Sequence, residues 1–530
     1  MSILVGNIRL PLEADDAQAI RFACERCGLR QSDLTDASIY RDSLDARRGK
    51  ITRVLSVLLT LPEGEEELVE RLGQNDIRLK KPAEEPAPSG TDQLNHRPVV
   101  IGLGPAGLFA AYMLAKNGYR PLVLERGQCI AERDRTVAAF HAGALLNPNS
   151  NIQFGEGGAG AYSDGKLTTR VNDPMAELVL HTLIRHGAPE EIARSAKPHI
   201  GTDILKQVVV SMREEIIRLG GEVRFESALT GICTSDGRLT AIQVGTEQIS
   251  CEQVILAIGH SARDTFEALY AQGVPFEPKA FSVGARIEHL QSTIDRGLYG
   301  SLAGHPALPP ASYNLSWRDG GRGCYSFCMC PGGHVVAAQS EEHSIVTNGM
   351  SYHARDGRNA NSAIVVSVGP EDFPSGGALA GIAFQRQIER AAFRMSGSYR
   401  APCQRVGDFL EDRPTKRAGA VQPTYPVGVE YGSISGCLPR FVTDMMRDGL
   451  RRFGRKIRGF DGADALLTAP ETRTSSPVRI PRTEERYSTK IVGLIPCGEG
   501  AGYAGGIMSA AVDGIACAAA VMRRYRPLEE

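Results

Sequence analysis

The chain has 530 residues, which is too long for one hydrophobic core and predicts three or four units of domain size. A hydrophobic content of 42% and a charged content of 23% are ordinary for a globular protein. The net charge of -1 gives no sign of a polyanionic partner or an anionic membrane surface. We therefore expect neither a nucleic-acid partner nor a membrane partner.

The sequence also lacks the signals of export. Its first residues, MSILVGNIRLPLEADD, contain no basic region followed by an apolar run, and no stretch of 18 apolar residues occurs. The nearest such stretch, residues 505–522, includes Asp513 and many small side chains, which suit a buried helix. The 12 cysteines follow no disulfide spacing. These features predict a cytoplasmic protein with free thiols and no bound metal.

The first 80 residues read as a small separate module. Their hydrophobic periodicity predicts, in order, a strand, a helix, two strands, a helix and a strand, at residues 3–10, 15–27, 38–43, 50–61, 65–72 and 76–79. This βαββαβ order is that of a ferredoxin-like α+β module. Cys24 and Cys27 lie three positions apart in its first helix. They are either core thiols or a redox or metal-binding pair. Residues 81–96, which are rich in Pro, Glu and Ala, predict a linker.

The segment after the linker has the complete pattern of a dinucleotide-binding unit. Residues 98–101 form a buried strand that runs into a G-x-G-x-x-G turn, a helix up to residue 117, a second strand at 121–124 and then an acid. In this unit the helix N-terminus faces the pyrophosphate, and the acid accepts hydrogen bonds from the ribose. The predicted cofactor contacts here are Gly102, Gly104, Pro105, Ala106, Gly107, Glu125 and Arg126.

Two further G-x-G-x-x-G matches indicate whether the cofactor is FAD or a nicotinamide nucleotide. Residues 155–160 follow no convincing strand, and residues 500–505 are too close to residue 530 for a second ribose-binding strand. Neither is a second Rossmann unit, and both suit glycine loops against the far end of one long cofactor. The sequence contains no separate NAD(P)H-binding domain, so NAD(P)H enters only as a transient electron donor. The predicted cofactor is FAD.

Three segments are predicted to reach the flavin end. Residues 252–259, ending at Gly259, and residues 491–500, with Gly498 and Glu499, resemble the second and the later fingerprints of glutathione-reductase-type flavoproteins. That resemblance places an acid on the ribityl chain, and Glu499 departs from the usual aspartate by one methylene. The helix that begins near Gly505, Gly506 and Ile507 would direct its positive end at the flavin.

The loop at residues 155–170, GEGGAGAYSDGKLTTR, is predicted to pass the flavin ring because its glycines allow close approach. It supplies Gly158, Lys166 and Leu167 as cofactor contacts, and either Lys166 or Arg170 as a charged contact to the flavin or the pyrophosphate. A purely structural glycine loop is the alternative.

Five long motifs together resemble one bacterial family of FAD-dependent dehydrogenases, the NAD(P)/FAD-dependent oxidoreductases, whose members are mostly uncharacterised. They are GEGGAGAYSDGKLTTR, AIGHSARDT, FCMCPGGHVV, ETRTSSPVRI and GEGAGYAGGIMSAAVDG. The resemblance covers nearly the whole chain. It implies a glutathione-reductase-like FAD fold with an FAD-dependent protein C-terminal domain, and it implies no particular substrate.

The fold predicted is thus α/β, a Rossmann-type FAD-binding domain with an inserted α+β substrate domain. We expect the FAD-binding domain at residues 97–263 and 471–530. Residues 264–470 would be a cap, with strands expected at 281–287, 325–329, 334–339 and 363–368. Four residues are candidates for catalysis: Lys166, Arg286, His289 and Cys330. Each has a structural alternative, such as a surface ion pair for Arg286 or an inert buried thiol for Cys330.

The function favoured is an FAD-dependent dehydrogenase or reductase in which a hydride passes between flavin N5 and a small-molecule substrate. A flavin monooxygenase that uses NAD(P)H transiently is one alternative. Another is a flavoprotein that binds RNA or a partner through its N-terminal module, although residues 1–80 lack an aromatic stacking motif. The oligomeric state is not predicted.

Overall fold

A computed structural model describes residues 1–46, 51–168 and 173–528. The N-terminal module has the predicted element order, with a four-stranded antiparallel sheet ordered β2-β3-β1-β4. Its elements are β1 (Ser2–Leu10), α1 (Asp16–Cys27), β2 (Asp36–Asp45), β3 (Thr52–Thr60), α2 (Glu65–Leu72) and β4 (Ile77–Lys80). The predicted start of the third strand, Lys50, lies outside the described residues. Cys24 and Cys27 are buried in this module's core, and burial raises the pKa of Cys27 to about 11.

The centre of the molecule is a parallel five-stranded sheet ordered β23-β11-β5-β6-β7. Its strands are β5 (Val99–Ile101), β6 (Leu122–Leu124), β7 (Glu222–Arg224), β11 (Val254–Leu256) and β23 (Leu494–Pro496). The first crossover helix is α3 (Pro105–Lys116), and α12 (Ile507–Arg524) packs beside it in one hydrophobic cluster. Four of these strands are fully buried and the edge strand β7 is partly buried, as is typical of a sheet covered on both faces. The predicted Rossmann-type unit is therefore present.

Further elements surround this sheet. The helices are α4 (Ile130–His141), α5 (Met175–Arg185), α6 (Thr202–Arg218) and α7 (Arg263–Ala271), with a 3-10 turn at Gly158–Tyr162. An antiparallel meander is formed by β8 (Leu229–Ser235), β9 (Arg238–Val244) and β10 (Glu247–Ser250). Phe266 and Leu269 of α7 share a hydrophobic cluster with the central strands, so this helix belongs to the same core.

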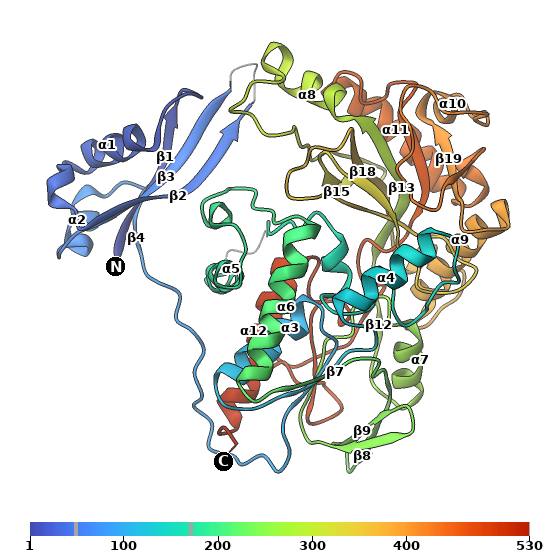
Figure 1. Cartoon of the computed structure of the whole chain (residues 1–530), viewed down its shortest axis with the longest axis horizontal. Helices are drawn as coiled ribbons and strands as arrows, with labels where there is room; N and C mark the ends of the chain where they lie inside the picture. The colour runs from blue at the N-terminus through green and yellow to red at the C-terminus, as the bar shows by residue number, and fades with distance from the viewer. Residues whose placement is uncertain (47–50, 169–172, 529–530) are drawn as a thin grey trace.

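A second layer is built on a seven-stranded sheet ordered β14-β15-β18-β13-β21-β19-β20. Its strands are β13 (Phe281–Leu290), β14 (Ser316–Asp319), β15 (Arg322–Cys330), β18 (Asn359–Val368), β19 (Ala401–Arg405), β20 (Val429–Tyr431) and β21 (Leu466–Glu471). The helices α8 (Gln291–Tyr299), α9 (Ala380–Ser396), α10 (Val406–Leu410) and α11 (Arg440–Lys456) accompany it. We call this layer the cap (Figure 1). A small ribbon, β16 (His334–Ala337) with β17 (Thr347–Met350), and the pair β12 (Glu277–Pro278) with β22 (Val478–Arg479) complete it.

The linker is held along the C-terminal helix. The backbone N–H groups of Ser89 and Gly90 donate to Met522 O, and that of Asp92 donates to Arg524 O. In Figure 1 this segment descends from the N-terminal module to the end of α12. The module also contacts the central domain, because the Asp42 N–H donates to Arg194 O and Lys80 pairs with Glu177 at 2.6 Å. Within the described residues, no helix has the length and apolar character needed to cross a membrane.

Candidate functional site

A cavity of about 400 Å³ lies where the carboxyl ends of the parallel strands meet the cap. Ligands of open α/β sheets bind at this edge. Thirteen predicted cofactor contacts line the cavity: Gly102, Gly104, Pro105, Ala106, Glu125, Arg126, Gly158, Lys166, Gly259, Glu499, Gly505, Gly506 and Ile507. The remaining three, Gly107, Leu167 and Gly498, lie behind its wall. The cap adds Phe327, Cys328, Asn348 and Arg473 to the lining.

At Gly102 and Gly107, in the glycine turn after β5, close backbone contacts leave no room for a side chain. Gly102 has φ +95°, and a Cβ there would meet the Ala257 carbonyl oxygen at 2.4 Å. A Cβ at Gly107 would stand 1.8 Å from the carbonyl oxygen of Gly102, so this glycine brings helix and strand together. A Cβ at Gly104 would reach only Gly158 Cα, at 3.8 Å, which leaves the turn open toward the cavity.

Two helices begin at the cavity. Pro105 and Ala106 from the first turn of α3 line it, as do Ile507 and Ala510 of α12. The first N–H groups of a helix have no partner within the helix, and they carry the positive end of its dipole. A Cβ at Gly505 or Gly506 would meet nothing within 4 Å, so the start of α12 is unobstructed. This pair of helix termini, with the glycine turn, suits a diphosphate and a ring that gains negative charge on reduction, and FAD carries both.

Glu125 ends β6 as predicted, and the structure gives it a further role. Its Oε2 accepts the N–H of Leu103 at 2.8 Å, and its Oε1 accepts the N–H groups of Gly127 and Gly155 at 2.9 Å each. The carboxylate therefore ties the glycine turn to the 155–160 loop. A carboxylate offers about four acceptor positions, so Oε2 retains one for a ribose hydroxyl. The neighbouring Arg126 pairs with Asp264 at 2.8 Å, and its guanidinium lies 4.2 Å from the Phe154 ring centroid.

Asp513 of α12 holds the end of β23 in place, a role that was not predicted from the sequence. Asp513 accepts the Gly498 N–H at 2.7 Å and forms ion pairs with Arg482 and Arg486, each at 2.6 Å. Cys497 and Cys517 lie within 4.8 Å of this carboxylate. Both oxygens of Asp513 already accept hydrogen bonds, from arginine side chains and from the Gly498 backbone. Asp513, Cys497 and Cys517 therefore support the Gly498 turn.

Glu499 and His260 both line the cavity, and Glu499 Oε1 lies 4.0 Å from His260 Nε2. Burial raises the pKa of Glu499 to about 7, against the lowering effect of Lys279. Burial, followed by the charges of Arg473 and Arg263, lowers the pKa of His260 to about 3. At neutral pH the His260 imidazole is therefore uncharged. The Glu499 carboxyl is protonated in part of the molecules, because its pKa lies near 7.

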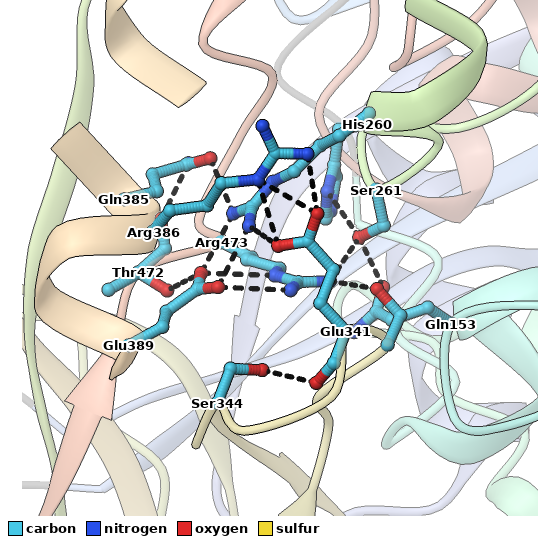
Figure 2. Close-up of polar contacts among 12 residues, drawn as sticks. Gln153, His260, Ser261, Glu341, Ser344, Gln385, Arg386, Glu389, Thr472 and Arg473 are labelled. Atoms are coloured by element: carbon cyan, nitrogen blue, oxygen red, sulfur yellow. Dashed lines mark hydrogen bonds and ion pairs between the residues drawn. The ribbon is translucent and has the colours of Figure 1, made fainter. Parts of the chain in front are cut away.

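A buried ion network joins the cap to the central domain (Figure 2). Glu389 of α9 is fully buried and accepts from Arg263 at 2.8 Å, from Arg473 at 3.1 Å and from Thr472 at 2.6 Å. Burial raises the pKa of the Glu389 carboxyl, but the guanidinium groups of Arg263 and Arg473 outweigh it and hold the pKa far below its usual value. This network was not predicted, because its members are separated by up to 210 positions in the sequence.

Arg473 carries this network into the cavity wall. Its Nη1 donates to Ser261 at 3.0 Å and to Ser340 at 2.6 Å, and Ser261 donates to Gln153 at 3.1 Å. Figure 2 shows Arg473 directed toward Ser261, in the loop after β11, and toward Gln153, in the loop after α4. The wall beside Gly259 is therefore rigid and hydrogen-bonded.

Two predicted catalytic residues lie elsewhere. Arg286 is fully buried in β13, where it pairs with Glu471 at 2.5 Å and donates to Cys328 O at 2.8 Å. His289, also buried, holds Phe460 O through Nε2 at 2.6 Å. Neither lines the cavity, because β13 is a central strand of the cap sheet and both of its faces are covered. The surface ion pair expected for this strand is therefore wrong, because Arg286 and His289 are both buried.

The two cap cysteines, Cys328 and Cys330, lie in different surroundings. The ladder between β15 and β18 shifts register between Phe327 and Cys330, and Cys328 has φ +45°. Because of this bulge, the two thiols do not follow the alternation of a regular strand. Cys328 lines the cavity, whereas Cys330 is fully buried and donates its thiol to Cys328 O at 3.3 Å. The predicted catalytic Cys330 is thus behind the wall, and its neighbour is the exposed member of the pair.

The remaining candidates lie in or near the 155–168 loop. Lys166 lines the cavity next to the buried Asp164, 3.5 Å from its carboxylate. Leu167 is buried in the hydrophobic cluster of α3 and α12. Arg170 lies outside the described residues.

The fold and the site define an FAD-dependent oxidoreductase. The family model "FAD-dependent protein, C-terminal domain-like" matches residues 280–474, and a domain of unknown function (DUF8436) matches residues 2–60. An "Uncharacterized protein" from Clostridium beijerinckii is 47% identical over 529 residues, which cover 99% of each chain. The chain belongs to the same family as this bacterial protein, a family of FAD-dependent proteins.

Two solved structures are more distantly similar. CtdE in complex with FAD is 14% identical, with 81% of this chain and 84% of that chain covered and a TM-score of 0.33. An L-amino acid deaminase from Proteus vulgaris is 10% identical, with 84% and 95% covered and a TM-score of 0.36. At such scores the likeness says nothing about the reaction.

Proposed function

We propose that the protein is an FAD-dependent dehydrogenase or reductase that acts on a small molecule held between the glycine turns and the cap. One observation carries the proposal: Phe327, Cys328 and Asn348 of the cap line the same cavity as the glycine turns at the strand ends. A substrate enclosed there would lie against the flavin end of the cofactor and be shielded from bulk water.

In this proposal the N–H groups at the start of α3, with the open face of Gly104, hold the diphosphate. Glu125 takes the ribose, and the start of α12 faces the flavin, where its dipole favours negative charge on the reduced ring. Bound FAD supplies the redox chemistry by accepting or giving a hydride at N5. The protein contributes orientation, a fixed polar wall through Arg473 and Ser261, and a proton held on Glu499 near neutral pH.

The experiment that tests this proposal separates it from a monooxygenase that takes NAD(P)H transiently. The holoenzyme is photoreduced without oxygen and mixed with a panel of oxidised metabolites, and return of the flavin absorbance is followed. Anaerobic reoxidation by at least one metabolite, with its stoichiometric reduction, is expected. If NADPH consumption and product formation both require oxygen, and the product contains an oxygen atom from O₂, the dehydrogenase assignment is wrong.

A further inference from the structure

One charged group on the cavity wall is not accounted for by the contacts above. Lys166 lines the cavity, and its Nζ is hidden from solvent yet makes no hydrogen bond to any residue that the structure describes. Asp164 is 3.5 Å away, but this carboxylate is already engaged by Arg355 in a two-pronged ion pair and by the Ser351 hydroxyl. The Lys166 ammonium therefore has donors left over, and a hidden ammonium without acceptors is costly.

The surroundings of Lys166 carry excess positive charge. Lys166, Arg355 and Lys197 lie close enough for the charges of Arg355 and Lys166, after burial, to lower the pKa of Lys197. Among the described residues, Asp164 is the carboxylate that pairs with this group, so the three cations leave a formal excess of two positive charges, which a thiolate at Cys328 would reduce to one. The nearby cation Arg286 is neutralised by Glu471. Burial lowers the pKa of Lys166, but negative charge on Cys330, Cys328 and Asp164 outweighs it and raises the pKa, so the ammonium stays charged.

This excess lies at the cap end of the cavity. The charges of Lys166 and Cys328 act on each other, and Cys328 lines the wall beside Phe327 and Asn348. Asn348 Oδ1 accepts from Arg286 at 3.1 Å and from the Gly349 N–H at 2.8 Å, so the amide nitrogen is the end that remains for a ligand. The dinucleotide-binding turns that line the same cavity follow the strands β5, β6 and β23. The cap end thus combines an ammonium with unused hydrogen-bond donors, an amide and an aromatic ring.

We propose that the substrate is a small carboxylate whose negative charge pairs with Lys166 at the cap end of the cavity. This inference rests on the proposed function, because it places the ligand where a substrate would meet the flavin. Charge-assisted hydrogen bonds from an ammonium to a carboxylate are about twice as strong as neutral ones. A neutral amide of the same shape would offer Lys166 a carbonyl oxygen but no negative charge, so the site discriminates by charge.

The test uses FAD-loaded full-length protein and follows the visible flavin spectrum during titration with benzoate, acetate and their neutral isosteres benzamide and acetamide. For the wild type, we expect at least one carboxylate to perturb the spectrum saturably, with its amide about tenfold weaker or more. Lys166→Met should weaken that carboxylate by about tenfold or more and leave the amide unchanged. Lys166→Arg should retain the preference for the carboxylate. Lys81→Met, at an exposed position of the linker, is the matched control and should bind as the wild type.

FAD content and melting temperature are measured first for every variant. A wild type that takes up no FAD contradicts the proposed function. If the wild type holds FAD but binds carboxylate and amide equally, or shows no saturable response to either carboxylate, only the substrate inference is overturned. It is also overturned if Lys166→Met keeps the carboxylate preference, or if this variant loses FAD while Lys166→Arg and Lys81→Met retain it, because Lys166 would then hold the cofactor.

Discussion

Gly514 of α12 lies directly against the carbonyl oxygen of Ala106 in the first turn of α3. A Cβ at position 514 would stand 2.1 Å from that oxygen, and a Cβ at Gly498 would stand 2.7 Å from the Ala106 side chain. The two helices whose N-termini face the cavity are therefore packed on each other at the position where both must be placed accurately. The C-terminal helix thereby becomes part of the dinucleotide-binding unit, although about 400 residues separate it from α3.

The first prediction follows from this contact. Gly514→Val should force α12 away from α3, lower the apparent melting temperature by roughly 2–4 °C for each kcal/mol lost and reduce bound FAD, because overpacking costs about 1–3 kcal/mol. Gly376→Val is the control, since a Cβ at Gly376 would meet nothing within 4 Å. Differential scanning fluorimetry and the flavin-to-protein absorbance ratio measure both effects. Equal behaviour of the two variants would show that the helix contact is not needed.

The second prediction separates cofactor binding from folding. Gly104 has φ -75°, which valine adopts, and its Cβ would make only an ordinary contact at 3.8 Å. Gly104→Val should therefore fold with the melting temperature of wild-type apoprotein but contain little FAD, since its methyl groups would occupy the diphosphate cradle. Flavin released by heat denaturation is quantified by fluorescence. Full occupancy in this variant would place the diphosphate elsewhere.

The third prediction concerns the network of Figure 2. Glu389→Gln leaves Arg263 and Arg473 buried without their shared carboxylate, which should cost about 3–5 kcal/mol. Glu267→Gln removes a half-exposed partner of Arg386 in the same region and should cost less than about 1 kcal/mol. Urea unfolding of the two variants compares these costs. A Glu389→Gln variant as stable as Glu267→Gln would mean that the network does not hold the cap in place.

These residues also show which parts of the fold could be predicted. The N-terminal module and the unit around Gly102 to Glu125 are local, because their strands, helices and turns follow one another and each leaves its own periodicity in the sequence. Glu389, Arg263 and Arg473 carry no such pattern, since their pairing exists only after the cap closes on the central domain. The burial of Arg286 and His289 was mispredicted for the same reason. Their strand reads as amphipathic by itself, but it lies in the middle of a sheet covered on both sides.

The cavity wall divides in a similar way. The glycine positions of the cavity wall could be predicted, because the backbone there approaches a neighbouring segment too closely for a side chain. Glycine is the residue that satisfies this constraint. The bulge that exposes Cys328 in place of Cys330 arises from pairing with β18, a strand about 30 residues further along. No pattern around residues 327–330 indicates where that register shift falls.

The fourth prediction is a pH dependence from His289. Burial lowers the pKa of this imidazole from 6.5 to about 4, against the smaller raising effect of its hydrogen bond to Phe460 O. The unfolded chain therefore binds the proton first as the pH falls, so the stabilisation is complete above pH 6.5 and is lost between pH 6.5 and 4. The difference corresponds to about 3 kcal/mol.

His289→Gln keeps a donor for Phe460 O but does not titrate. Compared with the wild type, this variant should lose less stability when the pH is lowered from 7 to 4.5, as measured by urea midpoints of the apoproteins. Parallel curves for the two proteins would show that His289 is not held neutral by burial.

The central claim is that N–H groups at the start of α3 and the glycine turns around the cavity bind one FAD. The most direct measurement is the absorption spectrum of the purified chain, followed by chromatographic identification and quantification of the nucleotide released on denaturation. We predict the visible absorption bands of an oxidised flavin, with about one FAD released per chain. A colourless protein that takes up no FAD on incubation with it would contradict the claim.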